Sequence, residues 1–144
     1  MIDITHKNTT LRTAVAQAIV KVSHQDTIDA VINNTVPKGN VFEMAKTAGL
    51  FAVKKTSDMI PDCHPLPVEY TGVNYDVKGL EIHINMEVKT IYRTGVEVKA
   101  MQIIFDRIHN QLFNKNIKTN KQARVVPIHW MIPVHKHNHS RGFY

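Results

Sequence analysis

The sequence predicts an α+β fold in which helices cover one face of a mixed or antiparallel sheet. Residues 80–90 alternate strictly between apolar and polar side chains, which is the period of a strand with one face in water. Lys78-Gly79 separates this stretch from a second apolar-rich one, so the two form a hairpin. Residues 41–55 instead carry apolar side chains at helical spacing.

Before the long helix, residues 11–22 fit a helix or a strand, because alanine favours one and the β-branched residues favour the other. Ser23 is the predicted N-cap of a short helix that ends near Ile32, with Asp26 as a capping acid.

Asn40 is the predicted N-cap of the long helix. The polar residues 56–58 predict its end. Its expected buried stripe consists of Val41, Met44, Ala45, Ala48, Phe51 and Ala52.

Beyond that helix, residues 68–77 predict the first strand of the hairpin, and 93–95 turn the chain into a helix that reaches about residue 113. Residues 114–122 are polar and basic and predict a loop. Residues 125–134 predict a final strand, which their prolines place at a sheet edge. The remaining tail is expected to be mobile.

Length, charge and cysteine content narrow the class of protein. A chain of 144 residues predicts one domain, here residues 1–144. The net charge of +6 favours an anionic partner such as a nucleotide, with a solvated basic surface as the alternative. One cysteine permits no internal disulfide, and no apolar run is long enough for a membrane helix. With no signal-peptide core at the start, a soluble cytoplasmic protein is expected.

Asp62, Cys63 and His64 lie between Pro61 and Pro65 and form the leading candidate site. His64 is the main titratable candidate because histidine changes charge nearest neutral pH. The alternative is a loop histidine held by a backbone hydrogen bond. Cys63 is either a nucleophile or incidental, since the neighbouring Asp62 opposes thiolate formation.

Two further turns each precede a helix and suit an anion. Lys38 lies in a Pro-Lys-Gly turn, where backbone N–H groups and an ammonium favour phosphate, unless it is an exposed turn lysine. Glu97 follows a similar turn and either joins the site or only complements the helix dipole. No metal or other cofactor is expected, even from the alternating His135, His137 and His139. The few aromatic residues do not interleave with basic ones, so nucleic acid is an unlikely partner on this sequence.

Several short segments resemble one known family, the MoaC family of cyclic pyranopterin monophosphate synthases in molybdenum cofactor biosynthesis. The resemblance covers residues 1–101 in order and spacing. The matching segments are residues 1–4, Lys38-Gly39-Asn40-Val41, Ala48-Gly49-Leu50, Lys54-Lys55-Thr56-Ser57, residues 60–66 and Thr94-Gly95-Val96-Glu97.

The resemblance implies a ferredoxin-like subunit, a homo-hexamer built as a trimer of dimers, and an active site at a dimer interface. Such enzymes act on a cyclised dihydro-GTP that a radical-SAM enzyme supplies. They convert it to cyclic pyranopterin monophosphate and release diphosphate. By position, the resemblance assigns Lys38 and His64 as catalytic residues. It assigns substrate binding to Asp62, Cys63, His64, Glu97 and Val98.

The chain departs from the family pattern at three places. The family carries aspartate at Asn40 and glutamate at Lys99. Its catalytic aspartate and lysine fall at Phe113 and Asn116 without a gap, whereas one inserted residue places Asn114 at the aspartate position. Either a true divergence of the sequence or an altered reading frame of the gene would explain the departures after residue 101. Two alternatives follow, namely a homologue that binds nucleotide without turnover and a general polyanion binder.

Overall fold

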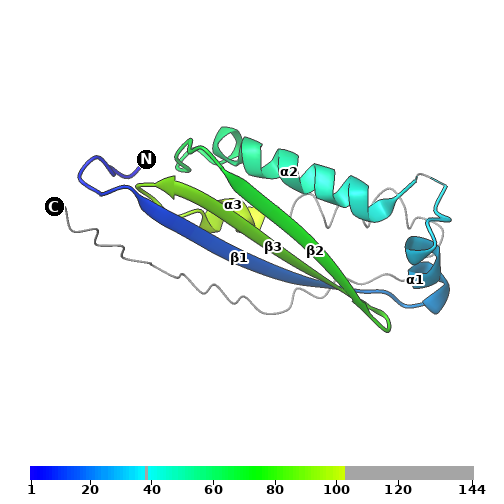
Figure 1. Cartoon of the computed structure of the whole chain (residues 1–144). Coiled ribbons are helices and arrows are strands. Elements are labelled where there is room, and N and C mark those ends of the chain that lie inside the picture. Colours follow the sequence, from blue (N-terminus) through cyan, green and yellow to red (C-terminus); the bar gives the residue numbers. More distant parts are fainter. Residues whose placement is uncertain (38, 103–144) are drawn as a thin grey trace.

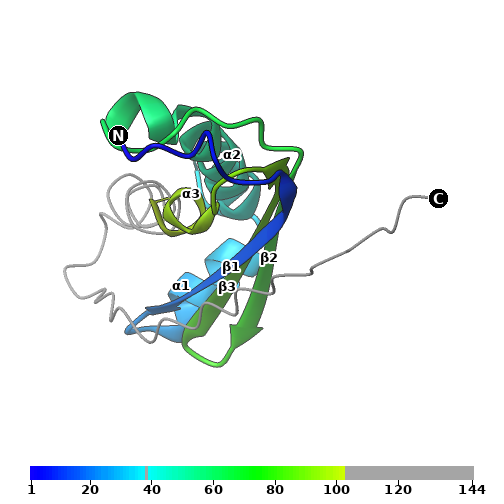
Figure 2. The same cartoon turned by 90° about the vertical axis from the view of Figure 1, so that its left-hand side faces the viewer.

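The computed structural model describes residues 1–37 and 39–102, and within them helices cover one face of a three-stranded antiparallel sheet (Figures 1 and 2). The strand order is β1-β3-β2. The elements are β1 (Thr10–Lys21), α1 (Gln25–Ile32), α2 (Val41–Met59), β2 (Tyr70–Lys78), β3 (Glu81–Tyr92) and α3 (Glu97–Gln102). The predicted α+β class is confirmed, and the order is consistent with a ferredoxin-like fold.

Four predicted features lie outside the described residues. They are the continuation of α3 to about residue 113, the loop at 114–122, the edge strand at 125–134 and the mobile tail that follows it. The extent of the predicted domain, residues 1–144, reaches into the same region and stays a prediction. Among the helices that the structure describes, none combines the length and apolar character that crossing a membrane needs.

The ambiguous segment before α1 is a strand. β1 pairs with β3 along its whole length, from Thr10 opposite Tyr92 to Lys21 opposite Glu81. This long ladder outweighs the helical preference of alanine, because tertiary pairing overrides a propensity of a few tenths of a kcal/mol per residue. Ala14 and Ala16 are both buried on the helix-covered face, where their small side chains leave room for the helices.

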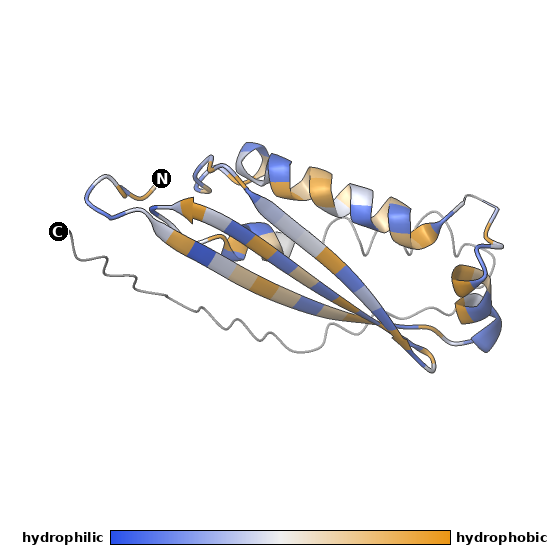
Figure 3. Ribbon diagram, in the orientation of Figure 1, coloured by the Kyte–Doolittle hydropathy of each residue, from blue (hydrophilic) through white to orange (hydrophobic). Residues whose placement is uncertain are grey.

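The central strand β3 follows the predicted alternation. Its side chains on the helix-covered face are all buried, and Figure 3 shows the alternating bands of hydropathy along the strands. They are Ile82, Ile84, Met86, Val88 and Thr90. Leu80 was expected to join them but lies in the hairpin and is 39% exposed. Gly79 has a positive φ of 57°, which this tight turn requires and which glycine adopts without steric cost.

Helix α2 begins as predicted, with the Asn40 side chain accepting a hydrogen bond from the Glu43 N–H at 3.0 Å. Part of the predicted stripe is wrong, since Phe51 is 61% exposed and Met44 is only half-buried. Both lie at the outer edge of a stripe that is centred on Ala45 and Ala52. The buried residues of α2 are Val41, Ala45, Ala48, Gly49, Ala52, Val53 and Thr56.

The predicted end of α2 at residues 56–58 is also wrong, because the helix continues to Met59. The buried Thr56 hydroxyl donates to the Ala52 carbonyl at 2.8 Å, so the polar side chain is satisfied within the helix. Lys55 and Asp58 form an ion pair at 3.1 Å on the exposed side. The start of α1 differs as well, since its N-cap is His24 rather than Ser23 and makes no side-chain capping bond.

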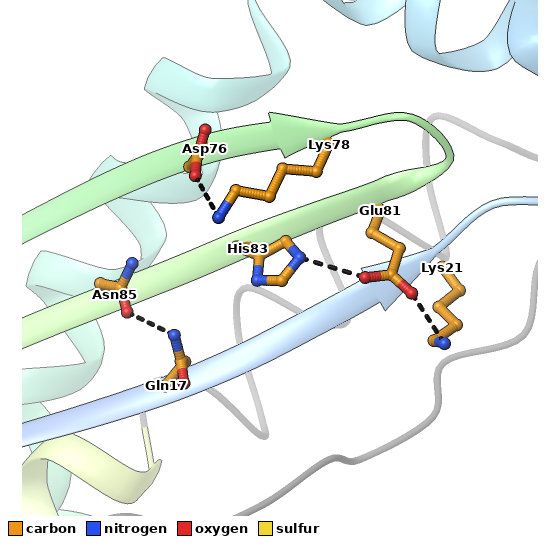
Figure 4. Close-up of polar contacts among 7 residues, drawn as sticks. All are labelled: Gln17, Lys21, Asp76, Lys78, Glu81, His83 and Asn85. Carbon is orange, nitrogen blue, oxygen red and sulfur yellow. Dashed lines mark hydrogen bonds and ion pairs between the residues drawn. The ribbon is translucent and has the colours of Figure 1, made fainter.

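The opposite face of the sheet is polar, as the alternation in β3 predicted. Gln17 on β1 donates to Asn85 on β3 at 2.9 Å, and Lys21 pairs with Glu81 at 2.7 Å (Figure 4). The hydrogen bond from Lys21 is the main cause that lowers the pKa of the Glu81 carboxyl. His83 lies 3.1 Å from the same carboxylate. Within residues 1–37 and 39–102, these cross-strand contacts give the polar side chains of this face partners on the neighbouring strands.

Tyr75 on β2 brings a polar atom into the layer between sheet and helices. Its ring packs against Phe42 of α2, with ring centroids 4.7 Å apart. Its hydroxyl is buried and has no hydrogen-bond partner among the described residues. Burial raises the pKa of Tyr75, because the phenolate is disfavoured away from water.

Replacing Tyr75 with phenylalanine removes this unsatisfied hydroxyl and keeps the ring. We expect Tyr75→Phe to raise the free energy of unfolding by about 1 kcal/mol, since a buried polar group without a partner is destabilising. Urea denaturation of the two proteins measures the change. Tyr70→Phe is the control and should leave stability unaltered, because Tyr70 is 48% exposed. A clear loss of stability in Tyr75→Phe would mean that the hydroxyl is hydrogen-bonded.

Candidate functional site

The predicted site residues divide between the two ends of α2. The turn that contains Pro37 and Gly39 precedes the helix, whereas Asp62, Cys63 and His64 follow it. A helix of 19 residues at 1.5 Å per residue separates these turns by roughly 28 Å. The two motifs therefore do not meet within one chain. Lys38 and Asn114 themselves lie outside the described residues.

The turn after α2 is closed by its own backbone. The Cys63 N–H donates to the Ile60 carbonyl at 3.0 Å, and the Cys63 thiol lies 3.8 Å from the His64 carbonyl. Cys63 and His64 are half-buried, while Asp62 is exposed. The flanking prolines restrict the backbone on both sides of the turn, so its three chemically distinct side chains are presented from a backbone of restricted conformation.

The start of the chain lies against this turn. The Met1 amino group is 2.9 Å from Asp62 Oδ1, and His64 Nε2 is 2.8 Å from the Ile2 carbonyl oxygen. The hydrogen bond from the amino group, together with its charge, lowers the pKa of the Asp62 carboxyl from its ordinary 3.8. The alternative of a histidine held by a backbone hydrogen bond thus describes part of the role of His64. The partner, 62 positions away, carries no local sequence signal.

The start of α3 holds Glu97 in a folded-back position. A Cβ atom added to Gly95 would lie only 1.9 Å from Glu97 Oε2, so the carboxylate occupies the space beside the glycine. Glu97 is half-buried and Val98 is 41% exposed. Glycine at position 95 therefore permits this carboxylate position, which a larger residue would exclude.

Lys99 connects α3 to α2. Its side chain is only 2% exposed, and its ammonium donates to the Val53 carbonyl at 3.5 Å. Figures 1 and 2 show that α3, the turn after α2 and the N-terminal residues lie at the same end of the molecule. We call this region, residues 1–3, 60–66 and 95–99, the turn end. Lys99 is therefore packed between α3 and α2 at this end of the molecule.

The turn end combines groups that suit proton transfer and the recognition of polar ligands. It carries the imidazole of His64, the thiol of Cys63 and three carboxylates, those of Asp3, Asp62 and Glu97. In residues 1–37 and 39–102, three or more metal-ligating side chains do not gather at any point. The alternating histidines of the tail fall outside that span. The groups at the turn end can hold a polar ligand and exchange protons with it.

Comparison with known proteins gives a consistent result. The family model described as the MoaC family matches residues 1–107. A relative from Saccharolobus solfataricus, named probable cyclic pyranopterin monophosphate synthase, is 43% identical over 101 residues, which cover 70% of this chain and 67% of the relative. The cyclic pyranopterin monophosphate synthase of Nitratidesulfovibrio vulgaris is 43% identical over 103 residues, covering 70% of this chain and 63% of that protein.

A third relative, cyclic pyranopterin monophosphate synthase 2 of Mycobacterium bovis, is 41% identical over 104 residues, covering 72% of this chain and 62% of its own length. The chain thus spans about two thirds of the length of the curated relatives it matches. The matched region contains every predicted site residue except Asn114. With a family match over residues 1–107 and identities above 40% to three named synthases, the chain belongs to the MoaC family.

Proposed function

We propose that this protein is a cyclic pyranopterin monophosphate synthase of molybdenum cofactor biosynthesis. It takes a cyclised dihydro derivative of GTP, converts it to cyclic pyranopterin monophosphate and releases diphosphate. The observation that carries the proposal is the family match across residues 1–107, with relatives that bear this name. The basic charge of the chain suits a triphosphate substrate.

In this proposal the site takes residues from two subunits. The length of α2 keeps the Lys38 turn and the His64 turn apart in one chain, so one substrate can reach both only if a second chain brings its own turn. An interface between two copies supplies this arrangement, and a homo-hexamer built from dimers repeats it. The separation of the two motifs by a single straight helix supports the composite site.

The roles follow from the chemistry of each group. His64 exchanges protons with the substrate, because an imidazole can both accept and donate a proton. Glu97, together with Asp62, Cys63 and Val98, holds the base and sugar of the substrate. Lys38, at the start of α2 in the neighbouring subunit, binds phosphate or moves a proton there.

The setting of the enzyme belongs to the same proposal. A radical-SAM enzyme supplies the cyclised nucleotide, and the protein works in the cytoplasm without a resident cofactor. The chain has one cysteine and so cannot form an internal disulfide, which suits a reducing compartment.

A second candidate is a homologue that binds the nucleotide without turning it over. The family match ends at residue 107, before Asn114, where the gapped comparison expects the catalytic aspartate. An amide cannot take up or release a proton at neutral pH. Incubating the purified protein with the cyclised nucleotide separates the two candidates. Formation of cyclic pyranopterin monophosphate supports the synthase, whereas saturable binding without product supports the second candidate.

His64→Ala should lower product formation by at least about 100-fold, because the variant loses a group that exchanges protons with the substrate. The matched control is His83→Ala, which removes another half-buried histidine, from the polar face of the sheet. Turnover rates, with oligomer size measured in parallel, are the readout. Full turnover by His64→Ala would remove this histidine from the site.

Mixing two inactive variants tests the composite site. In oligomers reassembled from Lys38→Ala and His64→Ala subunits, about a quarter of the sites should combine an intact Lys38 turn with an intact His64 turn. We therefore expect activity to return in the mixture although each variant alone is inactive. Unchanged inactivity after proven subunit exchange would show that one chain supplies both residues.

Gly95→Ala should displace the Glu97 carboxylate, because the added methyl group takes the space that the carboxylate occupies. We expect about a tenfold loss of kcat/KM and a change of less than about 0.5 kcal/mol in stability, since the end of a flexible side chain moves easily. Adding Gly95→Ala to Glu97→Ala should cost nothing further. A full additional loss in the double variant would place the effect of Gly95 elsewhere.

A further inference from the structure

The contact between Ile2 and His64 has chemical consequences beyond anchoring the chain. The His64 Nε2 atom lies 2.8 Å from the Ile2 carbonyl oxygen, which is an ordinary hydrogen-bond distance. A carbonyl oxygen only accepts hydrogen bonds, so Nε2 carries the hydrogen and donates. A neutral imidazole has one N–H group, and the other ring nitrogen, Nδ1, then presents a lone pair.

The ring has no second hydrogen-bond partner in the described part of the chain. Ile2 alone contacts it in this way, through Nε2. The backbone of Cys63 is engaged with Ile60, so the turn itself is fixed while the Nδ1 side of the ring stays available. The site proposed above needs a nitrogen that can accept a proton or a hydrogen bond, and Nδ1 is the nitrogen that satisfies this need.

The N-terminal residues are themselves held in a defined shape. The Asp3 carboxylate accepts hydrogen bonds from the Thr5 N–H at 2.9 Å and from the Thr5 hydroxyl at 2.8 Å. The Lys7 N–H donates to the Ile4 carbonyl at 3.1 Å. These local turns direct the first residues back over the turn end. The Ile2 side chain plays no part in the contact and is 77% exposed, so the backbone carbonyl alone recognises the histidine.

We propose that the backbone carbonyl of Ile2 positions His64, holding it as the Nε2–H tautomer so that Nδ1 faces the substrate as the proton acceptor. The role of His64 in turnover rests on the proposed function. The tautomer of the His64 ring does not depend on that function. The Ile2 carbonyl is therefore a positioning group that acts through His64.

The spectroscopic test uses the protein labelled with ¹⁵N-histidine and no substrate. Long-range ¹H–¹⁵N correlation at a pH where the ring is neutral distinguishes a protonated ring nitrogen from a bare one. The His64 signals are identified by their loss in His64→Ala. We expect a protonated Nε2 and a bare Nδ1. A protonated Nδ1 would overturn the proposal, whatever the activity of the enzyme.

A shortened protein, in which residues 2–5 are deleted and Met1 is kept, removes the carbonyl. The N-terminal segment before β1 then loses four residues, about 13 Å of extended chain, and no longer reaches the His64 ring. We expect kcat to fall between about 10- and 100-fold, because a misplaced catalytic group costs rates of this order. The His64 ring should also lose its single tautomer in the NMR spectrum.

Lys7→Ala is the matched control, since it removes an exposed side chain from the same segment and keeps residues 2–5 with the Ile2 carbonyl. It should retain both the tautomer and the activity. A deletion variant with higher activity would contradict the proposal and show that the N-terminal segment blocks the site. Unchanged activity and an unchanged tautomer after the deletion would contradict it too.

The variants also separate this inference from the proposed function. If His64→Ala keeps full turnover while the wild-type ring shows the expected tautomer, the catalytic role fails and the state of the ring stands. If His64→Ala is inactive but the deletion changes neither ring nor rate, the proposed function stands and the positioning by Ile2 fails.

Discussion

The packing of α2 along the sheet is the constraint on which the rest of the structure depends. Its 19 residues bury a stripe of mostly small side chains, so the helix lies as one straight element over the strands (Figure 1). The same helix fixes where both of its flanking turns lie, at opposite ends of the molecule. A fold that needs α2 for its core therefore cannot bring those turns together within one chain, which is the observation that supports the proposed composite site.

The fold was largely predictable where one local signal dominates. The alternation of residues 80–90 and the Asn40 cap indicated the central strand and the start of α2, because side-chain period and capping are local properties. The segment that forms β1 stayed ambiguous because its alanines favour a helix and its β-branched residues favour a strand. Its pairing with β3, which the local sequence does not reveal, makes it a strand. Phe51 was mispredicted because it lies at the outer edge of the buried stripe. The end of α2 was mispredicted because Thr56 satisfies its hydroxyl inside the helix, which a count of polar residues does not detect.

The site was predictable as a set of residue types but not as an arrangement. Prolines on both sides identify the turn with Asp62, Cys63 and His64, and the resemblance to the MoaC family assigns them a purpose. The contact of His64 with Ile2 joins residues that are far apart in the sequence, and the folded-back Glu97 depends on the space beside Gly95. Both contacts depend on tertiary structure, so no local sequence pattern predicts them.

The most direct measurement of the central claim is a cross-linking experiment between the two turns. Cys63 is the one cysteine of the chain, so Pro37→Cys adds a second thiol at the opposite end of α2. With a bis-maleimide much shorter than α2, we predict a covalent dimer, because the introduced thiol of one subunit lies near Cys63 of another. The native protein and Asp26→Cys, a variant with its thiol on the exposed side of α1, should remain mostly monomeric on a denaturing gel. Monomer alone from Pro37→Cys, in a protein that turns over substrate, would contradict a site shared between subunits.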